Sequence, residues 1–391
     1  MLPNRTLPWR FPVYLTCLLA AAMLVLASGS ARADDPLAGD APVNPGPRAH
    51  LSGAMRPADI RRTAAKVAAW QYERVKSHRS LDWTFAPLYL GFLDASTLLG
   101  KPEYAAYVHA NGEHFHWGLG PRVRHADDQA VGQAWLTLYR RHPDPAMLEA
   151  IRRRFDARMK HPRHGKRPLW WWCDALFMGP PVWAGLARVT HRRAYLDHMD
   201  HQWWITTRLL YDTREHLFSR DVSYLQRHEA NGRKLFWSRG NGWVMAGLAR
   251  VLALMPADYP SRPHYLTQFR QMAASLAKLQ GDDGLWRPGL LDATAYPRPE
   301  VSGSALITFA LAWGVHHGVL DEAAYRPVVA RAWRGLVGQI YASGRLGNIQ
   351  PIGAAPGDYL PGSSYVYGVG AFLMAASEVD AVARLPAQKL D

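Results

Sequence analysis

Apolar residues recur every three or four positions along most of the chain, which is the spacing that places them on one face of an α-helix. The pattern begins near residue 58 and runs almost to the end of the chain. It predicts about a dozen helices, near residues 58–76, 83–99, 103–116, 128–141, 145–159, 173–189, 192–210, 240–255, 263–280, 302–317, 321–341 and 364–379. We therefore expect an all-α protein.

The breaks between these segments are mostly short and contain residues that end helices. Gly100-Lys101-Pro102 and His142-Pro143-Asp144-Pro145 are two examples, since Gly and Pro cannot easily continue a helix. Short connections make consecutive helices antiparallel. About six such hairpins without a linker favour an (α/α)6 barrel, a single domain over residues 59–385. An α-solenoid is the competing architecture, but no fixed-period repeat is visible.

Two longer stretches, residues 211–234 and 281–299, mix Asp, Gly, Pro, Arg and aromatic residues without helical periodicity. Loops longer than about a dozen residues in a compact domain are usually functional. We expect both stretches to lie at the mouth of the ring.

The N-terminus has the pattern of a secretory signal peptide over residues 1–33. Arg5 and Arg10 precede an apolar run, and Ala31 and Ala33 are the small residues that a signal peptidase reads. We expect cleavage after Ala33 and a periplasmic or secreted protein. No second apolar run reaches the length needed to span a bilayer, so no stable membrane insertion is expected after cleavage. Residues 34–58, rich in Pro, Gly and Ala, are expected to be a flexible segment.

The composition favours an acidic sugar as the partner. The formal net charge is +14, and it falls to +11 once the leader's three arginines leave, since that leader carries no acids. A positive field attracts anions, but the basic residues are dispersed and no nucleic-acid motif is present, so we expect no nucleic-acid partner. The 16 Trp and 17 Tyr residues supply flat faces for sugar rings. The alternative is that the charge says nothing about partners.

The candidate proton donor is Asp174, in the segment WWWCDALFMGPP from Trp170 to Pro181. It follows three tryptophans and opens an apolar helix. Partial desolvation raises a carboxyl pKa toward values useful for a general acid. An Asp at this position is also a common helix N-cap, and the segment alone does not decide between the two roles.

A pair of acids, Asp127 and Asp128, stands ahead of the next most suggestive helix start, in HADDQAVGQAW. Two carboxylates offered from different helices can flank one substrate, as in glycoside chemistry, with one kept protonated by the charge of the other. The alternative is again capping and interaction with the helix dipole.

Metal and cofactor chemistry find little support in the sequence. The 17 histidines are scattered without the spacing of a zinc site. The chain has no Gly-rich phosphate loop and no G-x-S-x-G nucleophile elbow. We expect no metal and no cofactor.

Six co-linear segments between Trp83 and Val379 carry a family resemblance: WTFAPLYLG, ADDQAVGQ, WWWCDALFMGPP, FWSRGNGW, DGLWRPGLLD with PEVSGSA, and the tail with GNIQPIG and YGVGAFLMAASEV. The chain resembles glycoside hydrolase family 105, the unsaturated rhamnogalacturonyl hydrolases, which is related to family 88. The resemblance implies an (α/α)6 barrel. It also implies removal of a 4,5-unsaturated uronic acid from the non-reducing end of lyase-generated oligosaccharides, with pectin rhamnogalacturonan as the expected source.

The resemblance also implies residue roles. Asp174 matches the general acid and base of the family, and either Asp127 or Asp128 matches the assisting acid. Histidines that the family carries before the catalytic aspartate and in a later loop have no secure counterparts here. The candidates to replace them are His164, Arg220 and Tyr224, and this departure leaves the identity of the substrate open.

Under this reading Asp174 protonates C4 of the unsaturated sugar, and water then adds at C5. We expect the substrate's carboxylate to bind Arg239, which offers a planar fork of donors, and its rings to stack on tryptophans. The candidate binding residues are Trp83, Trp172, Trp237, Arg239, Asn241, Trp243, Trp286, Ser302 and Ser304. The alternatives are a polysaccharide lyase of the same architecture and a non-catalytic periplasmic oligosaccharide-binding protein. The sequence is compatible with a monomer or a homodimer.

Overall fold

The computed structural model describes residues 35–160 and 168–386. The expected signal peptide with its cleavage after Ala33, and the candidate His164, lie outside these residues.

Thirteen α-helices run through the described residues. They are α1 (Pro57–Val75), α2 (Phe85–Leu99), α3 (Pro102–His114), α4 (Gly132–Arg141), α5 (Pro145–Lys160), α6 (Ala175–Met178), α7 (Pro180–Thr190), α8 (Arg193–Leu210), α9 (Ser238–Leu254), α10 (Arg262–Lys278), α11 (Val301–His316), α12 (Glu322–Val337) and α13 (Val366–Ala383). Three 3₁₀ turns, at Asp127–Gln129, Val222–Tyr224 and Ala293–Ala295, and four two-residue strands, β1 (Gly39–Asp40), β2 (Tyr211–Asp212), β3 (Leu217–Phe218) and β4 (Ser364–Tyr365), complete the fold.

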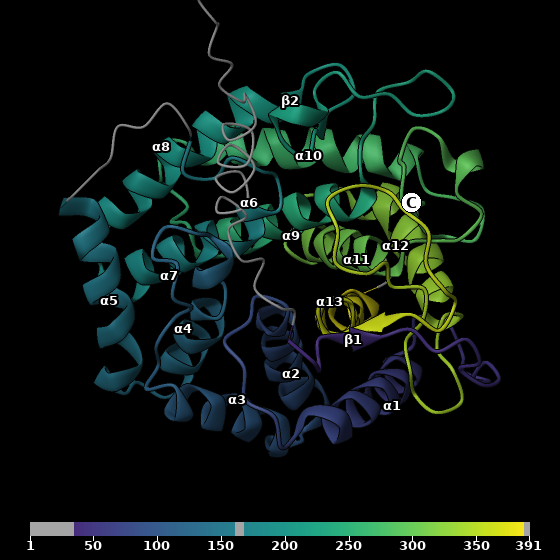
Figure 1. The fold of residues 1–391 in the computed structure, drawn as a ribbon, viewed down its shortest axis with the longest axis horizontal. Coiled ribbons are helices and arrows are strands. Elements are labelled where there is room, and N and C mark those ends of the chain that lie inside the picture. The colour runs from purple at the N-terminus through teal and green to yellow at the C-terminus, as the bar shows by residue number, and fades with distance from the viewer. Residues whose placement is uncertain (1–34, 161–167, 387–391) are drawn as a thin grey trace, which may run out of the picture. The chain divides into compact units, whose positions relative to one another are not determined.

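The helices form two concentric layers (Figure 1). The inner helices α2, α4, α7, α9, α11 and α13 each contact the next, and α13 returns to contact α2, which closes the ring. The outer helices α1, α3, α5, α8, α10 and α12 pack against them. The expected all-α (α/α)6 barrel is therefore confirmed, and the closed ring excludes the solenoid.

The last inner helices are apolar nearly all round, because they lie in the core. Every residue of α11 from Val301 to Val315 is buried, and a helix that is hydrophobic on all sides is one that is buried on all sides. The outer helices α8 and α12 instead bury one face, so their apolar residues recur with helical spacing.

Glycines allow the inner helices to approach closely where the ring closes. A Cβ added at Gly370 of α13 would lie 2.2 Å from the carbonyl oxygen of Pro87 in α2, and one at Gly91 would lie 2.5 Å from the oxygen of Gly370. No side chain fits in these gaps, so the seam between the first and last inner helices depends on the two glycines.

The chain reverses direction from each inner helix to the next outer helix, and again from that outer helix to the following inner one. The inner helices therefore all begin at the same end of the barrel. Three irregular segments lead into α9, α11 and α13, over residues 211–237, 279–300 and 338–363. The first two match the expected irregular stretches. The third was expected in part as helix up to residue 341, but α12 ends at Val337.

The predicted helix 173–189 is two helices. The one-turn α6 ends before Gly179, and α7 begins at Pro180. Pro180 and Pro181 lack the N–H groups that a continuous helix would need, so a new helix starts there instead.

Residues 35–56 are attached to the barrel, contrary to the expectation of a free leader. Strand β1 pairs antiparallel with β4, and Asp40 forms a two-pronged ion pair with Arg345 at 2.7 and 2.9 Å. The amide of Ala49 donates to the oxygen of Ile340 at 2.8 Å. The composition was misleading because backbone groups, a few charges and a small number of apolar side chains, among them Leu51 and Met55, are enough to make these contacts.

Helix α13 is long and apolar enough to cross a membrane by length and composition alone. The expectation that no second run reaches that length was therefore wrong. However, 78% of the helix is buried inside the barrel, which is the usual position of such a core helix.

Candidate active site

Asp174 lies directly before α6, at the end where the inner helices begin. Its side chain is buried, at 8% exposure. Although it occupies the N-cap position, it makes no capping hydrogen bond. Oδ1 has no hydrogen-bond partner among the described residues, and Oδ2 lies 3.8 Å from Nε of Arg220. The capping alternative does not account for this carboxyl group.

Burial raises the pKa of Asp174 above its ordinary value, while the positive charges of Arg220 and Arg239 oppose that shift. Desolvation prevails because it acts on the whole carboxyl group, and neither arginine makes a hydrogen bond with it. The group can therefore hold a proton at pH values where an exposed aspartate is ionised.

Asp128 belongs to a structural clamp. Arg122 binds its Oδ1 through Nε at 3.0 Å and Nη2 at 2.7 Å, and the backbone amide of Arg122 donates to Oδ2 at 2.5 Å. The carboxylate is 4% exposed. With both oxygens engaged, Asp128 fixes the segment before α4.

Asp127 makes weaker contacts and faces the charge of Asp174. Its Oδ2 lies 3.3 Å from Nδ1 of His125 and 4.0 Å from Nη2 of Arg122. Burial raises its pKa to about 7, and the negative charges of Asp174 and Asp128 add to that rise against the opposing charge of Arg122. The charge of Asp174 thus favours the protonated form of Asp127.

His125 stands beside this pair and was not among the residues expected from the sequence. Its ring lies 4.7 Å from that of Trp172. Burial, followed by the charge of Arg122, lowers its pKa to about 4. The imidazole is thus neutral at neutral pH and can accept or donate a hydrogen bond. Its position two residues before Asp127 was the signal that could have identified it.

Arg239 lies in the first turn of α9 with its guanidinium buried, at 1% exposure. Nη1 donates to the oxygen of Gln350 at 2.6 Å and to the Tyr367 hydroxyl at 3.2 Å, and Nη2 donates to the oxygen of Pro351 at 2.8 Å. No carboxylate of the described residues pairs with it. Its charge reaches Asp174, so it is a candidate for binding an anionic group near that acid.

Three of the candidate tryptophans surround this region. Trp83 stacks on Tyr367 at 5.4 Å between ring centroids and keeps part of its surface exposed. Trp237 lies under the Arg239 guanidinium at 4.4 Å, and its Nε1 donates to Gln350 at 2.9 Å. Trp172 packs against Trp171. Only Trp83 offers an accessible ring, because Trp172 and Trp237 are 4% and 2% exposed.

Five other candidates are part of the core rather than of an open site. Asn241 is fully buried and exchanges hydrogen bonds with both backbone groups of Phe218. Trp243 packs on Phe177 at 4.8 Å, and Trp286 donates from Nε1 to the oxygen of Leu276 at 2.8 Å. Their polar atoms are satisfied within the protein or their faces are covered, so these contacts give the prediction that they bind substrate no support.

Ser302 and Ser304 are likewise fully buried. The Ser302 hydroxyl donates to Glu300 at 2.6 Å, and the Ser304 hydroxyl accepts from the amide of Trp286 at 3.0 Å. Glu300 caps α11 and also accepts from the amide of Gln350 at 3.1 Å. These residues position Gln350, which in turn holds Arg239.

Gln350 and Tyr367 were missed because their role depends on contacts across the chain. Both lie in the segments GNIQPIG and YGVGAFLM, which carried the family resemblance but received no role. Gln350 is 111 residues from Arg239, so local periodicity could not connect the two.

Of the residues considered as substitutes for the family histidines, Arg220 reaches Asp174. Its Nη1 binds Asp221 at 2.5 Å, and its guanidinium lies 5.5 Å from the Trp171 ring. Tyr224 is 8% exposed and packs under Arg227 at 4.1 Å; no contact joins it to Asp174 among the described residues.

One group of possible metal ligands occurs in the described part of the chain, formed by His316, His317 and Glu378. His316 and His317 come at the end of α11, whereas Asp174 lies where the inner helices begin. Nδ1 of His316 and Oε2 of Glu378 are 2.9 Å apart. The group is remote from the acids described above.

Two carboxyl groups with raised pKa values, Asp174 buried and Asp127 half-buried, at the mouth of an (α/α)6 barrel, define a candidate for acid–base chemistry on sugars. A model of Glycosyl Hydrolase Family 88 matches residues 59–383. The chain belongs to the superfamily of glycoside hydrolase families 88 and 105, and it is a glycoside hydrolase.

Two similar proteins are also named as hydrolases. An unsaturated 3S-rhamnoglycuronyl hydrolase of Formosa agariphila is 38% identical over 340 residues, covering 82% of this chain and 90% of the relative. A protein of the same name from Alteromonas sp. (strain LOR) is 33% identical over 328 residues, covering 78% and 79%.

Solved structures show the same fold. A family 88 hydrolase from Bacteroides vulgatus has a TM-score of 0.78 at 31% identity, covering 83% of this chain and 98% of that one. A protein described as a polysaccharide lyase also has a TM-score of 0.78, at 34% identity, covering 82% and 96%.

Proposed function

We propose that the protein removes a 4,5-unsaturated uronic acid from the non-reducing end of an oligosaccharide, with Asp174 as the proton donor and Asp127 as its partner. The observation that carries the proposal is the environment of Asp174: a buried carboxyl group with a raised pKa and one oxygen without a partner. Oδ1 itself is buried, so a substrate atom would reach the carboxyl group through the 12% of the side chain that stays exposed.

The first step is proton transfer from Asp174 to C4 of the sugar. The C4=C5 double bond supplies the electron pair for the new C–H bond, and positive charge develops at C5 and the ring oxygen. A general acid works best with a pKa near the working pH, and burial moves the pKa of Asp174 in that direction.

In the second step water adds at C5. The ionised partner carboxylate accepts a proton from the water, and the hemiketal at C5 opens to a ketone by breaking the C5–O5 bond. The hemiacetal that this leaves at C1 then breaks the glycosidic bond to give an aldehyde, and its hydroxyl proton passes to the released oligosaccharide. Asp127 fits the role of partner better than Asp128, because Arg122 holds both oxygens of Asp128.

Arg239 is the proposed binding site for the uronate carboxylate. Its guanidinium is buried and donates to three oxygens of the protein, but it has no acidic partner among the described residues and its charge reaches Asp174, so it can attract an anion to this region. Trp83 supplies an exposed ring on which the sugar can stack. The Trp237 ring lies under the guanidinium and holds it in place.

The sugar next to the uronic acid is proposed to be rhamnose. The sequence alone suggested rhamnogalacturonan from pectin, and a relative named unsaturated rhamnogalacturonyl hydrolase, from Bacillus subtilis, is 29% identical over 140 residues. The two longer matches are to 3S-rhamnoglycuronyl hydrolases. They favour a glucuronyl–rhamnose unit with sulfate on rhamnose.

The test uses the ultraviolet absorbance of the conjugated C4=C5 bond. The wild-type protein should remove this absorbance from lyase-digested acidic polysaccharides, and Asp174→Asn should keep the fold while losing at least about a thousandfold in kcat. Asp128→Asn serves as the structural control, measured with its circular dichroism. Retained activity in Asp174→Asn would refute the assignment.

The same assay separates hydrolysis from lyase chemistry, which the description of one structural neighbour raises. A lyase creates the conjugated bond, so absorbance would rise on intact polysaccharide. Binding of the unsaturated oligosaccharide by the wild-type protein without any change in absorbance would indicate a non-catalytic protein.

We also propose that the protein acts outside the cytoplasm after cleavage behind Ala33. The charged and apolar pattern of residues 1–33 supports this location. N-terminal sequencing of the protein from periplasmic and culture fractions tests the cleavage site, and size-exclusion chromatography with light scattering decides between monomer and homodimer.

A further inference from the structure

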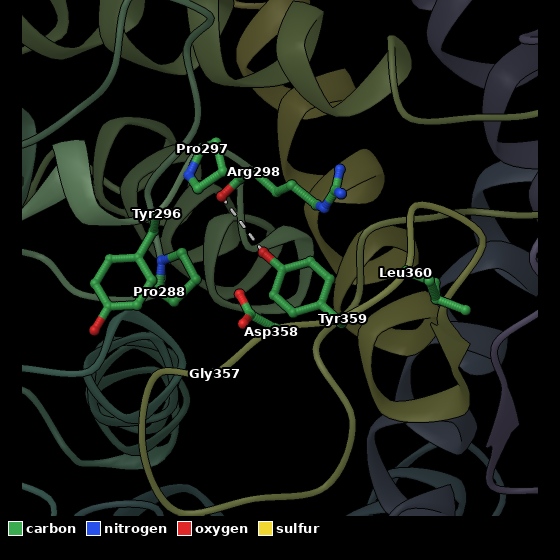
Figure 2. A pocket seen from close by; sticks show the side chains of 8 residues that line it. All are labelled: Pro288, Tyr296, Pro297, Arg298, Gly357, Asp358, Tyr359 and Leu360. Carbon is green, nitrogen blue, oxygen red and sulfur yellow. Dashed lines mark hydrogen bonds between the residues drawn. The ribbon is translucent and has the colours of Figure 1, made fainter.

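A hollow lies beside the residues that hold Arg239, between two of the irregular segments. Its volume is about 370 Å³, enough for a sugar ring. Pro288, Tyr296, Pro297 and Arg298 line it from residues 279–300, and Asp358 and Tyr359 line it from residues 338–363. Figure 2 shows these side chains around the opening. We call it the loop pocket.

The loop pocket is built on the same segments that hold the candidate site. The amide of Ser238, next to Arg239, donates to the oxygen of Pro288 at 2.8 Å, and Trp237 bridges to Gly289. On the other segment, Gln350 and Pro351 accept from Arg239. The pocket therefore lies next to the residues proposed to hold the uronate, on the side of residues 288–298.

Two tyrosine rings form fixed walls of the pocket. The Tyr359 hydroxyl donates to the oxygens of Pro299 at 2.9 Å and Arg298 at 3.4 Å, and the Tyr296 hydroxyl donates to Glu229 at 2.8 Å. Both rings are half-buried. Held aromatic faces next to two prolines suit the apolar face of a sugar.

Arg298 gives the pocket a free positive charge. Its side chain is exposed, and within the described residues no acid forms an ion pair with its guanidinium. In Figure 2 the guanidinium lies on the opposite side of the Tyr359 ring from the Asp358 carboxylate. An anion is thus favoured at the Arg298 side, while Asp358 can accept hydrogen bonds from sugar hydroxyls.

We propose that the loop pocket receives the sugar that follows the unsaturated uronic acid, and that Arg298 binds an anionic substituent on the released part of the substrate. This inference rests on the proposed function. The shared chemistry is an oxyanion, which is either a sulfate on the first sugar or the carboxylate of a uronate further along.

The experiment compares Arg298→Gln with wild type on an unsaturated glucuronyl–rhamnose disaccharide with a 3-sulfate on rhamnose, and on the same disaccharide without sulfate. The variant should raise KM for the sulfated substrate about tenfold with little change in kcat, and leave the unsulfated one unchanged. Arg298→Lys should recover part of the loss. Arg214→Gln, at an exposed arginine outside the pocket, is the matched control for loss of one surface charge.

If Arg298 instead binds the carboxylate of a uronate further along the substrate, the same variant gives a different result. In that case Arg298→Gln weakens turnover of an unsulfated tetrasaccharide with a second uronate, and leaves the sulfated disaccharide unaffected. An equal loss on all substrates, no loss on any, or an equal loss in Arg214→Gln would overturn the proposal.

Binding separates this proposal from the proposed function. Asp174→Asn alone and Asp174→Asn with Arg298→Gln are titrated with the sulfated disaccharide and the unsulfated tetrasaccharide by calorimetry. A tenfold weaker binding of either in the double variant supports the pocket even if wild type shows no turnover. Failure of turnover counts against the proposed function, whereas unchanged or absent binding of both counts against the pocket.

Discussion

At the residue scale, the adjacent acids Asp127 and Asp128 differ in the groups that bind their carboxylates. Asp128 is held by three donors from Arg122, whereas Asp127 keeps weaker contacts and has a pKa raised to about 7. The motif in the sequence offers two equal carboxylates. The fold fixes Asp128 through its hydrogen bonds with Arg122 and leaves Asp127 with a raised pKa near the charge of Asp174.

Arg220 influences the pH at which Asp174 loses its proton. Its positive charge lowers the pKa of Asp174 against the effect of burial. Arg220→Gln should therefore raise that pKa and move the alkaline limb of the kcat/KM profile upward by about 0.5 to 1 pH unit. Arg220→Lys, which keeps the charge, should leave the limb near its wild-type position. A limb that stays in place in Arg220→Gln would mean that another group controls it.

Asp127 should lower the free energy of unfolding at alkaline pH. Because its pKa in the folded state, about 7, lies above the unfolded value, the folded protein binds the extra proton between these values and loses stability as pH rises through that window. Asp127→Asn should raise the free energy of unfolding at pH 8 by on the order of 1 kcal/mol and leave it nearly unchanged at pH 4. Urea denaturation at both pH values measures this. Equal effects at both would contradict the pKa assignment.

At the element scale the irregular segments act as frames for the site. Residues 338–363 supply the oxygens that hold Arg239 and the glutamine that binds Trp237. Residues 211–237 carry Arg220, and residues 279–300 carry Pro288, which ties the start of α9. Each segment precedes an inner helix, so the rigid helix starts fix segments that have little regular structure of their own.

The seam between α2 and α13 should tolerate no added carbon. Gly370→Ala places a Cβ 2.2 Å from the Pro87 oxygen and should lower the free energy of unfolding by about 1–3 kcal/mol through overpacking. Gly353→Ala, whose Cβ would lie 3.7 Å from its nearest neighbour, should change it by less than about 0.5 kcal/mol. Chemical denaturation of both variants tests the seam, and equal stabilities would argue against close packing there.

At the scale of the whole molecule, residues 35–56 belong to the fold. They pair with β4 and hold Arg345 through Asp40. Their composition alone resembles that of a linker, because proline and glycine conceal how many backbone groups find partners.

Removal of this segment should loosen the C-terminal part of the barrel. A chain beginning at Pro57 should melt about 2–5 °C below one beginning at Asp35 and show faster amide exchange in residues 338–365. Asp40→Asn in the longer chain isolates the contribution of the ion pair. A truncated chain with unchanged melting and exchange would show that these contacts are unimportant.

The sequence was sufficient for the architecture because helix periodicity, Gly and Pro breaks and co-linear motifs all agree. It also located Asp174, since its neighbours form a recognisable segment. It could not show that Ser302, Ser304 and Asn241 are buried and hydrogen-bonded within the protein, because a polar residue at a helix start can face the substrate or a neighbouring backbone with the same spacing. Gln350 was not predicted from the sequence for a different reason, since its partners are more than a hundred residues away along the chain.

The closure of the ring by α13 has a consequence for how the enzyme is made. Among the described helices this one is synthesised last, yet it supplies the partner of α2 and the tyrosine that contacts both Trp83 and Arg239. A nascent chain would therefore expose the apolar flank of α2 and lack part of the Arg239 cradle until α13 has been synthesised. The core and the proposed substrate site would then be completed together, and we expect chains that lack α13 to be inactive.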